Sequence, residues 1–379
     1  MIQILFFLLT LSFAHNLKIY VFDVEQCDSQ LIVFPSGYSI LIDAGEPVYS
    51  ETATNGPYIA KRIEEILGKK EVDVLVLTHY HIDHHGGYEI GGIWYLVEVA
   101  GITFKKFIGR DIGVFSGKTM DECTMKNVEW HKVGFNELNN LKFVCYSTSS
   151  VNKTKLSAVR EVAEICSTSQ INPPDENTEV QIIISDAYGV SDKNGTRLDQ
   201  NLYRKIGSPN ENDYSICLRI QFGDFVYSTC GDLSGNDIYS DTGSYHDVES
   251  FIAPMMGEVD LYHSNHHGSK TSTNKVLSDT MIPTVSIISC GDRNETGLPA
   301  IATLSNLENV GSMIYLTNNC NKTNVSQFPE STIVYYADVI VTVPKDGTKF
   351  IVAKPDGSVH KIYNIKQNKP KRKECAPLV

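Results

Sequence analysis

Residues 78–87 read Thr-His-Tyr-His-Ile-Asp-His-His-Gly-Gly and place four metal-type side chains within six positions. They follow the apolar run 72–77, which is typical of a strand buried on both faces. Alternate residues of an extended chain point the same way, so His79 and His81 can share one cation. The stretch therefore predicts a metal site at the end of a buried strand.

Two further candidates follow within the same stretch. Asp83 and His84 lie where Gly86 and Gly87 allow a sharp turn, so they can serve a second cation beside the first. Imidazole and carboxylate ligands together suit zinc, and also manganese or iron; of these we expect Zn²⁺, with Mn²⁺ as the alternative. A chance surface cluster of histidines is the competing interpretation. It fits poorly because a buried strand precedes the cluster and paired glycines close it.

Composition indicates an ordinary globular protein. The 379 residues are enough for one large domain or two average ones, and 42% are hydrophobic while 21% are charged. The formal net charge of -12 argues against a broadly basic nucleic-acid-binding surface. It leaves room for a small site at which bound cations supply the positive field.

The first residues predict export. Residues 1–14 form an apolar run that is short for a membrane span, and Ser12 and Ala14 fit a cleavage site before His15. A buried N-terminal strand is the rival interpretation. We expect a signal peptide, a secreted or extracellular protein (or one in the lumen of the secretory pathway), and no transmembrane segment.

The cysteines and the glycosylation sequons agree with an exported protein. The chain has nine cysteines, and an exported protein would join several of them in disulfides. Because the number is odd, at least one cysteine stays unpaired. Cys217 lies in an apolar run, so it is also interpretable as a small buried hydrophobic residue. Five Asn-x-Ser/Thr sequons predict a glycoprotein. They are headed by Asn152, Asn194, Asn294, Asn321 and Asn324.

The pattern His79-x-His81-x-Asp83-His84-x-Gly86 resembles the signature of the metallo-β-lactamase-fold hydrolases. Residues 23–29, 212–215 and 266–272 narrow the resemblance to the hydrolase domain of bacterial DNA-uptake competence proteins (ComEC type). The resemblance implies an αββα sandwich, in which helices flank two mixed β-sheets.

The resemblance also implies a domain plan. The hydrolase domain covers residues 15–345, with family-specific loops at 110–210, and a C-terminal strand extension and basic tail cover 346–379. Within this plan we expect a strand at 141–145, a helix at 155–165 and a solvated basic tail at 369–373.

Further ligands follow from the resemblance. Asp232 closes a strand after Gly231, as the carboxylate that bridges the two metal ions does in this fold. His266 is expected to complete the second metal site, and Asp43 to orient a histidine ligand. Asn212 stands in the region where many members of the fold carry a third histidine, which leaves the first site short of a ligand.

The implied function is that of a secreted hydrolase that uses metal-activated water, with one or two divalent ions, Zn²⁺ or Mn²⁺. Asp83 steers the nucleophile, His267 positions substrate or donates a proton, and Lys270 contacts an anionic group. The expected substrate is a small or polymeric phosphodiester or ester, and nucleic acid enters only as a substrate. The alternatives are a phosphorylcholine esterase or lactone/ester hydrolase, and an inactive secreted binding protein of the same fold.

Overall fold

The computed structural model describes residues 16–47, 53–113, 115–124, 138–150, 153–191, 209–239, 244–291, 297–320, 328–345 and 347–376. The expected signal peptide (1–14) and all five sequon asparagines lie outside these residues. The export and glycosylation predictions therefore stay predictions.

A nine-stranded sheet, here called the N-terminal sheet, has the strand order β16-β15-β14-β1-β2-β3-β4-β5-β6. Strands β1 to β3 pair antiparallel, whereas β3 to β6 run parallel, so the sheet is mixed. Its strands are β1 (Asn16–Val21), β2 (Gln30–Val33), β3 (Ser39–Ile42), β4 (Glu71–Leu77), β5 (Thr103–Gly109), β6 (Arg160–Val162), β14 (Val339–Pro344), β15 (Lys349–Ala353) and β16 (Val359–Asn364).

A seven-stranded sheet, here called the C-terminal sheet, has the order β13-β12-β11-β10-β9-β8-β7. Its β7 to β9 strands pair antiparallel and β9 to β13 run parallel. The strands are β7 (Thr178–Ile184), β8 (Cys217–Phe222), β9 (Phe225–Thr229), β10 (Leu261–His263), β11 (Val285–Ile288), β12 (Met313–Leu316) and β13 (Thr332–Val334).

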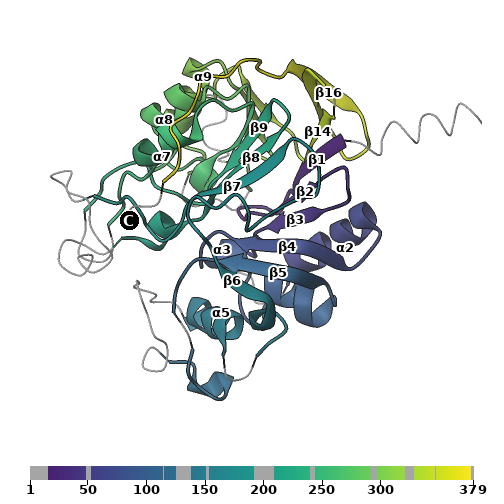
Figure 1. Cartoon of the computed structure of the whole chain (residues 1–379), viewed down its shortest axis with the longest axis vertical. Helices are drawn as coiled ribbons and strands as arrows, with labels where there is room; N and C mark the ends of the chain where they lie inside the picture. The colour runs from purple at the N-terminus through teal and green to yellow at the C-terminus, as the bar shows by residue number, and fades with distance from the viewer. Residues whose placement is uncertain are drawn as a thin grey trace, which may run out of the picture.

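Helices cover the outer faces of the two sheets, so the predicted αββα sandwich is confirmed (Figure 1). Those on the N-terminal sheet are α2 (Asn55–Leu67), α3 (Ile82–His85), α4 (Gly92–Trp94) with the π-helical turn Tyr95–Val99, and α5 (Leu138–Thr148). Those on the C-terminal sheet are α7 (Glu249–Met256), α8 (Lys275–Met281) and α9 (Ile301–Asn309). Short 3₁₀ turns occur at Met120–Glu122, Ser157–Val159, Glu211–Tyr214 and Asn265–Gly268.

The main core lies between the sheets, where Ile19 and Ile40 of the first pack in one cluster with Leu218 and Tyr227 of the second. Strand β4 is buried from Val72 onward because one face meets the other sheet and the other face meets helices. That double burial explains why its sequence is continuously apolar rather than alternating.

Two local predictions are wrong. Residues 141–145 belong to helix α5, whose Phe143 and Val144 pack with Leu75 on the outer face of the N-terminal sheet. A short apolar run fits a buried helix as well as a strand. The helix expected at 155–165 is instead a 3₁₀ turn followed by β6, which pairs with β5. That pairing is long-range, so local spacing does not reveal it.

Four disulfides join described cysteines: Cys123–Cys145, Cys166–Cys375, Cys217–Cys230 and Cys290–Cys320. Cys27 stays free and buried, which agrees with an odd count. Cys217 is both buried and paired. None of the helices in the described segments is long and apolar enough to cross a membrane.

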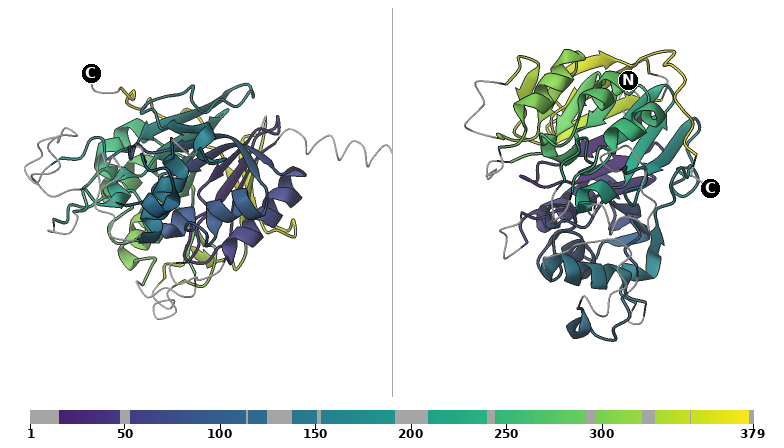
Figure 2. Two further views of the ribbon diagram at one scale, coloured as in Figure 1. Left: turned by 90° about the horizontal axis from the view of Figure 1, so that it is seen from below. Right: turned by 90° about the vertical axis from the view of Figure 1, so that its left-hand side faces the viewer.

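The C-terminal tail runs from β16 back along strands β7 and β8 of the C-terminal sheet (Figure 2, right). The prediction that residues 369–373 are simply solvated is wrong for Lys369 and Arg372. Lys369 forms an ion pair with Asp260 at 2.8 Å, and Arg372 forms one with Glu179 at 3.2 Å. The tail is therefore packed onto the fold through charge pairs and a disulfide.

Candidate metal centre

The side chains of the 78–87 stretch lie in the loop after β4 and in helix α3. His79 Nε2 lies 3.0 Å from His81 Nδ1, so the two alternate histidines face the same space. Gly86 ends α3 with a φ of 87°, and a Cβ there would lie 2.3 Å from the Cα of Gly92. Only glycine allows this close passage of the chain behind the histidines.

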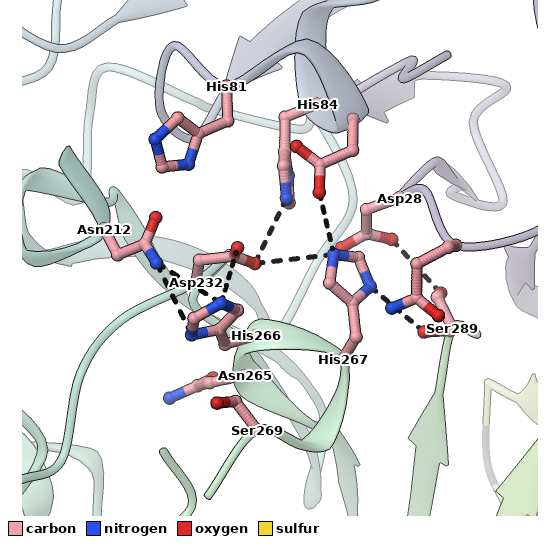
Figure 3. Close-up of polar contacts among 12 residues, drawn as sticks. Asp28, His81, His84, Asn212, Asp232, Asn265, His266, His267, Ser269 and Ser289 are labelled. Carbon is pink, nitrogen blue, oxygen red and sulfur yellow. Dashed lines mark hydrogen bonds and ion pairs between the residues drawn. The ribbon is translucent and has the colours of Figure 1, made fainter. Parts of the chain in front are cut away.

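A first cluster of donor atoms joins three distant parts of the sequence (Figure 3). Its ligand atoms all lie within 4.8 Å of one another, and its members are Asp83, His84, Asp232 and His267. His84 Nε2 is 3.1 Å from Asp232 Oδ1, and His267 Nε2 is 3.5 Å from Asp83 Oδ2. Two carboxylates and two imidazoles at this spacing make a donor set suited to zinc.

A second cluster consists of His79, His81 and Asp232. Asp232 belongs to both clusters: its Oδ2 lies 3.8 Å from His79 Nε2, while its Oδ1 faces His84. One carboxylate therefore stands between two groups of histidines, which is the arrangement expected of a bridging ligand.

Asp232 reaches this position because of the residue before it. Gly231 has a φ of 52°, and a Cβ on it would lie 2.5 Å from Thr78 Oγ1. The end of β9 can therefore approach the end of β4 only with glycine at this position.

His84 and His267, the two histidines of the first cluster, are each oriented by a hydrogen bond, which decides which ring nitrogen faces the site. Asp43 accepts from His84 Nδ1 at 2.8 Å and also from the amide and hydroxyl of Thr78. The carbonyl of Ser289 accepts from His267 Nδ1 at 3.0 Å. Because each Nδ1 donates to an oxygen, each Nε2 can bind a metal. Metal-binding histidines are commonly oriented in this way by a partner outside the metal site. The predicted contact of Asp43 with a site histidine is present.

The donor set fits a divalent cation. The Nε2 atoms of His84 and His267 are fully buried and face the oxygens of Asp232 and Asp83 without the geometry of a hydrogen bond. Buried polar atoms are normally paired, and an unpaired one is costly. A cation between them would satisfy both nitrogens and the neighbouring carboxylates at once.

The electrostatics of the first cluster point the same way. Burial alone would raise the pKa of Asp232, but the field of His84 and the other histidines holds this pKa well below its usual range. Burial opposes charge on His267, yet Asp232 and Asp83 raise its pKa to about 9. The carboxylates of the first cluster thus favour positive charge between them, which a divalent ion would supply.

The first cluster contains His267, whereas the ring of His266 lies beside the second cluster, and the predicted role of His266 as a metal ligand stays a prediction. Both residues have left-handed backbones, with φ of 51° and 50°, and their ring centroids are 6.5 Å apart. His266 approaches Asp232 Oδ2 at 3.7 Å, the oxygen that faces the second cluster. This consecutive left-handed turn, which no spacing rule reveals, separates the two rings.

The Asn-x-x-Ser segment flanks the second cluster. The Nδ2 atom of Asn212 lies 3.4 Å from the His266 ring, and the hydroxyl of Ser215 accepts a hydrogen bond from the Asp232 amide at 3.2 Å. The region expected to lack a third histidine therefore contributes polar groups that hold Asp232 and His266.

Lys270 is exposed, and within the described residues its side chain forms no ion pair with either cluster. Its contact with an anionic group stays a prediction. The sequence also gave no signal for Glu211, which accepts a hydrogen bond from the backbone amide of Tyr80 at 2.9 Å. Tyr80 separates His79 from His81, so Glu211 fixes the backbone that carries both. Only its place beside Asn212 could have drawn attention to it.

Comparisons with known proteins agree with this geometry. The family model described as the metallo-beta-lactamase superfamily matches residues 22–101, which include β4 and the 78–87 stretch. Recombination protein 2 of Haemophilus influenzae is 26% identical over 137 residues, which is 35% of this chain and 16% of that protein. The match thus spans about a sixth of the relative's length.

Among solved structures, unliganded yeast PDE1 aligns with 80% of this chain and 87% of its own. The sequence identity is 12% and the TM-score is 0.34.

Proposed function

We propose that this chain, whose residues 22–101 match the model of the metallo-beta-lactamase superfamily and whose sandwich fold brings metal-type side chains together, is a secreted metal-dependent phosphodiesterase. The observation that carries the proposal is the position of Asp232, whose two oxygens face two separate groups of histidines. A carboxylate placed this way suits a two-metal site.

In this proposal Asp83, His84, Asp232 and His267 hold one cation. His79, His81 and Asp232 hold the other. Bound divalent cations would lower the pKa of a water molecule towards neutrality and stabilise negative charge on the phosphoryl oxygens. Zn²⁺ fits the donor set best and Mn²⁺ is the alternative.

The chain's own residues then supply orientation and proton transfer. The Asp83 side chain is 22% exposed, so its carboxylate can accept a hydrogen bond and then the proton from an attacking water. The water oxygen bonds to phosphorus as the P–O bond to the leaving group breaks. His266, with 18% of its side chain exposed beside the second cluster, donates a hydrogen bond to the leaving oxygen, which takes its proton from solvent water. This role replaces the one expected for His267.

Two observations support the finer parts of the proposal. Four disulfides favour an oxidising compartment and hence secretion. The name of the curated relative, Recombination protein 2, supports a nucleic acid as the polymeric phosphodiester. The negative overall charge does not oppose such a substrate, since bound cations would supply the local positive field.

The test is hydrolysis of bis-nitrophenyl phosphate by protein loaded with Zn²⁺ or Mn²⁺, beside a phosphocholine ester and a lactone. We expect turnover of the phosphodiester and a loss of more than about 100-fold in the Asp232→Asn variant. Asp121→Asn, at an exposed carboxylate, is the matched control and should keep full activity.

If the protein turns over the phosphocholine ester or the lactone faster than the phosphodiester, the proposed phosphodiester substrate is wrong and the faster substrate's class takes its place. Metal-loaded protein that turns over none of the three would instead indicate a binding protein that retains the fold.

A further inference from the structure

A cavity of about 580 Å³ lies between strands β7 to β9 and the C-terminal tail. None of its lining residues belongs to either metal cluster. Its floor includes Gln181 of β7 and Arg219 of β8, which face each other across the paired strands. Tail residues between Lys366 and Cys375 form one wall.

Arg219 on this floor is a buried cation without a carboxylate partner. Its residue is 6% exposed, its Nε donates to the Met256 carbonyl at 3.1 Å and its Nη1 donates to Gln221 at 3.0 Å. Among the described residues no carboxylate oxygen lies within 4.0 Å of its guanidinium. Burial and the nearby Arg372 lower the pKa of Arg219 to about 10.

The carboxylates nearest to Arg219 are already engaged. Asp260 pairs with Lys369, and Glu179 pairs with Arg372. The lining also includes Asp224, Glu258 and Glu374, but among the described residues none of these carboxylates forms an ion pair with Arg219. An unpaired charge removed from water is costly, so an anion in the cavity would be stabilised.

Gln181, beside Arg219, has a hydrogen-bond acceptor that lacks a donor. Its Oε1 is buried without a hydrogen-bond partner, while its Nε2 donates to the Cys166 carbonyl at 3.2 Å. The Cys166 carbonyl fixes the orientation of the Gln181 amide. If the amide were flipped, Oε1 would face the carbonyl oxygen, and two acceptors cannot form a hydrogen bond. An unpaired acceptor thus faces the same cavity as the unpaired cation.

We propose that this cavity binds an anionic small molecule that carries a hydrogen-bond donor beside its charge, namely a phosphate monoester with a neighbouring hydroxyl group. The planar guanidinium of Arg219 matches phosphate oxygens, and the hydroxyl donates to Gln181 Oε1. Lys371 lies at the cavity wall with its side chain 86% exposed and pairs with Glu374 at 3.3 Å, so the anion is held by Arg219 rather than by Lys371. The site is separate from the metal centre.

The experiment is calorimetric titration of the metal-loaded full-length protein with ribose 5-phosphate, sulfate and neutral ribose. We expect both anions to bind and ribose not to bind. Arg219→Met should weaken binding of both anions at least tenfold. Gln181→Leu should weaken only ribose 5-phosphate, since sulfate offers no donor. Asp232→Asn should retain this binding event, which separates it from phosphate held at the metal centre.

Lys275→Met removes a cation that is 75% exposed on α8 and serves as the control. Where Arg219→Met does not fold, a Cys166→Ser/Cys375→Ser variant tests the site instead, because releasing the tail removes one wall and should also cost at least tenfold. The proposal is overturned if neither anion binds the wild-type protein at millimolar concentration. It is equally overturned if every folded variant binds both anions as wild type does.

Discussion

Both carboxylate oxygens of Glu211 accept hydrogen bonds from the side chain of Arg110. One of these oxygens, Oε1, also accepts a hydrogen bond from the backbone amide of Tyr80. The distances are 2.8 Å from Arg110 Nε and 2.9 Å from the Tyr80 amide, and Arg110 is fully buried. The Arg110 guanidinium also lies over the rings of Tyr80 and Tyr214. This buried pair connects the end of β5 with the backbone between His79 and His81.

Replacing Glu211 with Gln should therefore weaken the second cluster. The substitution removes the closer of the two carboxylates beside buried Arg110 and leaves Asp186, whose Oδ1 lies 4.0 Å from Nη1; breaking such a buried pair costs about 3–5 kcal/mol of unfolding free energy. We expect metal affinity at the second cluster to fall by about 10–100-fold, as for other outer partners of metal ligands. Chemical denaturation and metal titration measure the two effects. Glu71→Gln, at an exposed pair with Lys105, should change neither. Unaltered metal affinity in a folded Glu211→Gln protein would contradict the positioning role.

Gly231 and Gly223 form a matched pair for testing the approach of β9 to the metal motif. Both have positive φ, 52° and 58°, but only a Cβ at Gly231 meets Thr78 while one at Gly223 meets nothing within 4 Å. Alanine at either position should cost about 1–2 kcal/mol for the left-handed backbone. Only Gly231→Ala should also displace Asp232 and lose metal binding and activity. Equal activity of the two variants would show that the close approach is unimportant.

Asp23 should make stability depend on pH. Burial, with added repulsion from Asp338 and Glu25, raises its pKa to about 6 in the folded protein, from about 3.9 in an unfolded chain. The folded state thus favours the neutral form, so the stabilising effect is complete below pH 4 and is lost as pH rises through 6. Because the carboxyl is partly exposed, we expect a decline on the order of 1 kcal/mol.

Denaturation curves of the wild type and Asp23→Asn between pH 4 and 7 measure this decline. The variant should lack it, since its amide does not titrate. Parallel pH profiles for the two proteins would assign the decline to another group.

Metal removal should lower stability. The first cluster leaves two imidazole nitrogens and two carboxylates without a cation between them, so metal binds the folded state preferentially. At a free Zn²⁺ concentration about 100 times Kd the gain is about 2.7 kcal/mol. Thermal unfolding with and without a chelator should show this difference in wild-type protein and not in Asp232→Asn. A chelator that leaves the wild-type melting temperature unchanged would argue against a metal site.

Parts of the fold and site could be predicted because they rest on local chemistry. The apolar run of β4, the alternate histidines after it and the glycines at 86 and 87 are adjacent in the chain. Asp232 was recognisable only through the resemblance, because Gly-Asp by itself is also a common turn pair. In contrast, the run 141–145 became a helix because its apolar side chains pack on the outer face of a sheet that local spacing does not show.

The sequence by itself determined which side chains can bind a metal and that they follow a buried strand, since ligand chemistry and strand periodicity are properties of neighbouring residues. Only the tertiary structure decided that His267 rather than His266 joins the first cluster, because a left-handed turn separates the two rings. It also decided that Glu211 supports the histidine backbone and that Arg219 forms no ion pair within the part of the chain that the structure describes. Both depend on contacts between segments far apart in the chain, which appear only when the two sheets pack together.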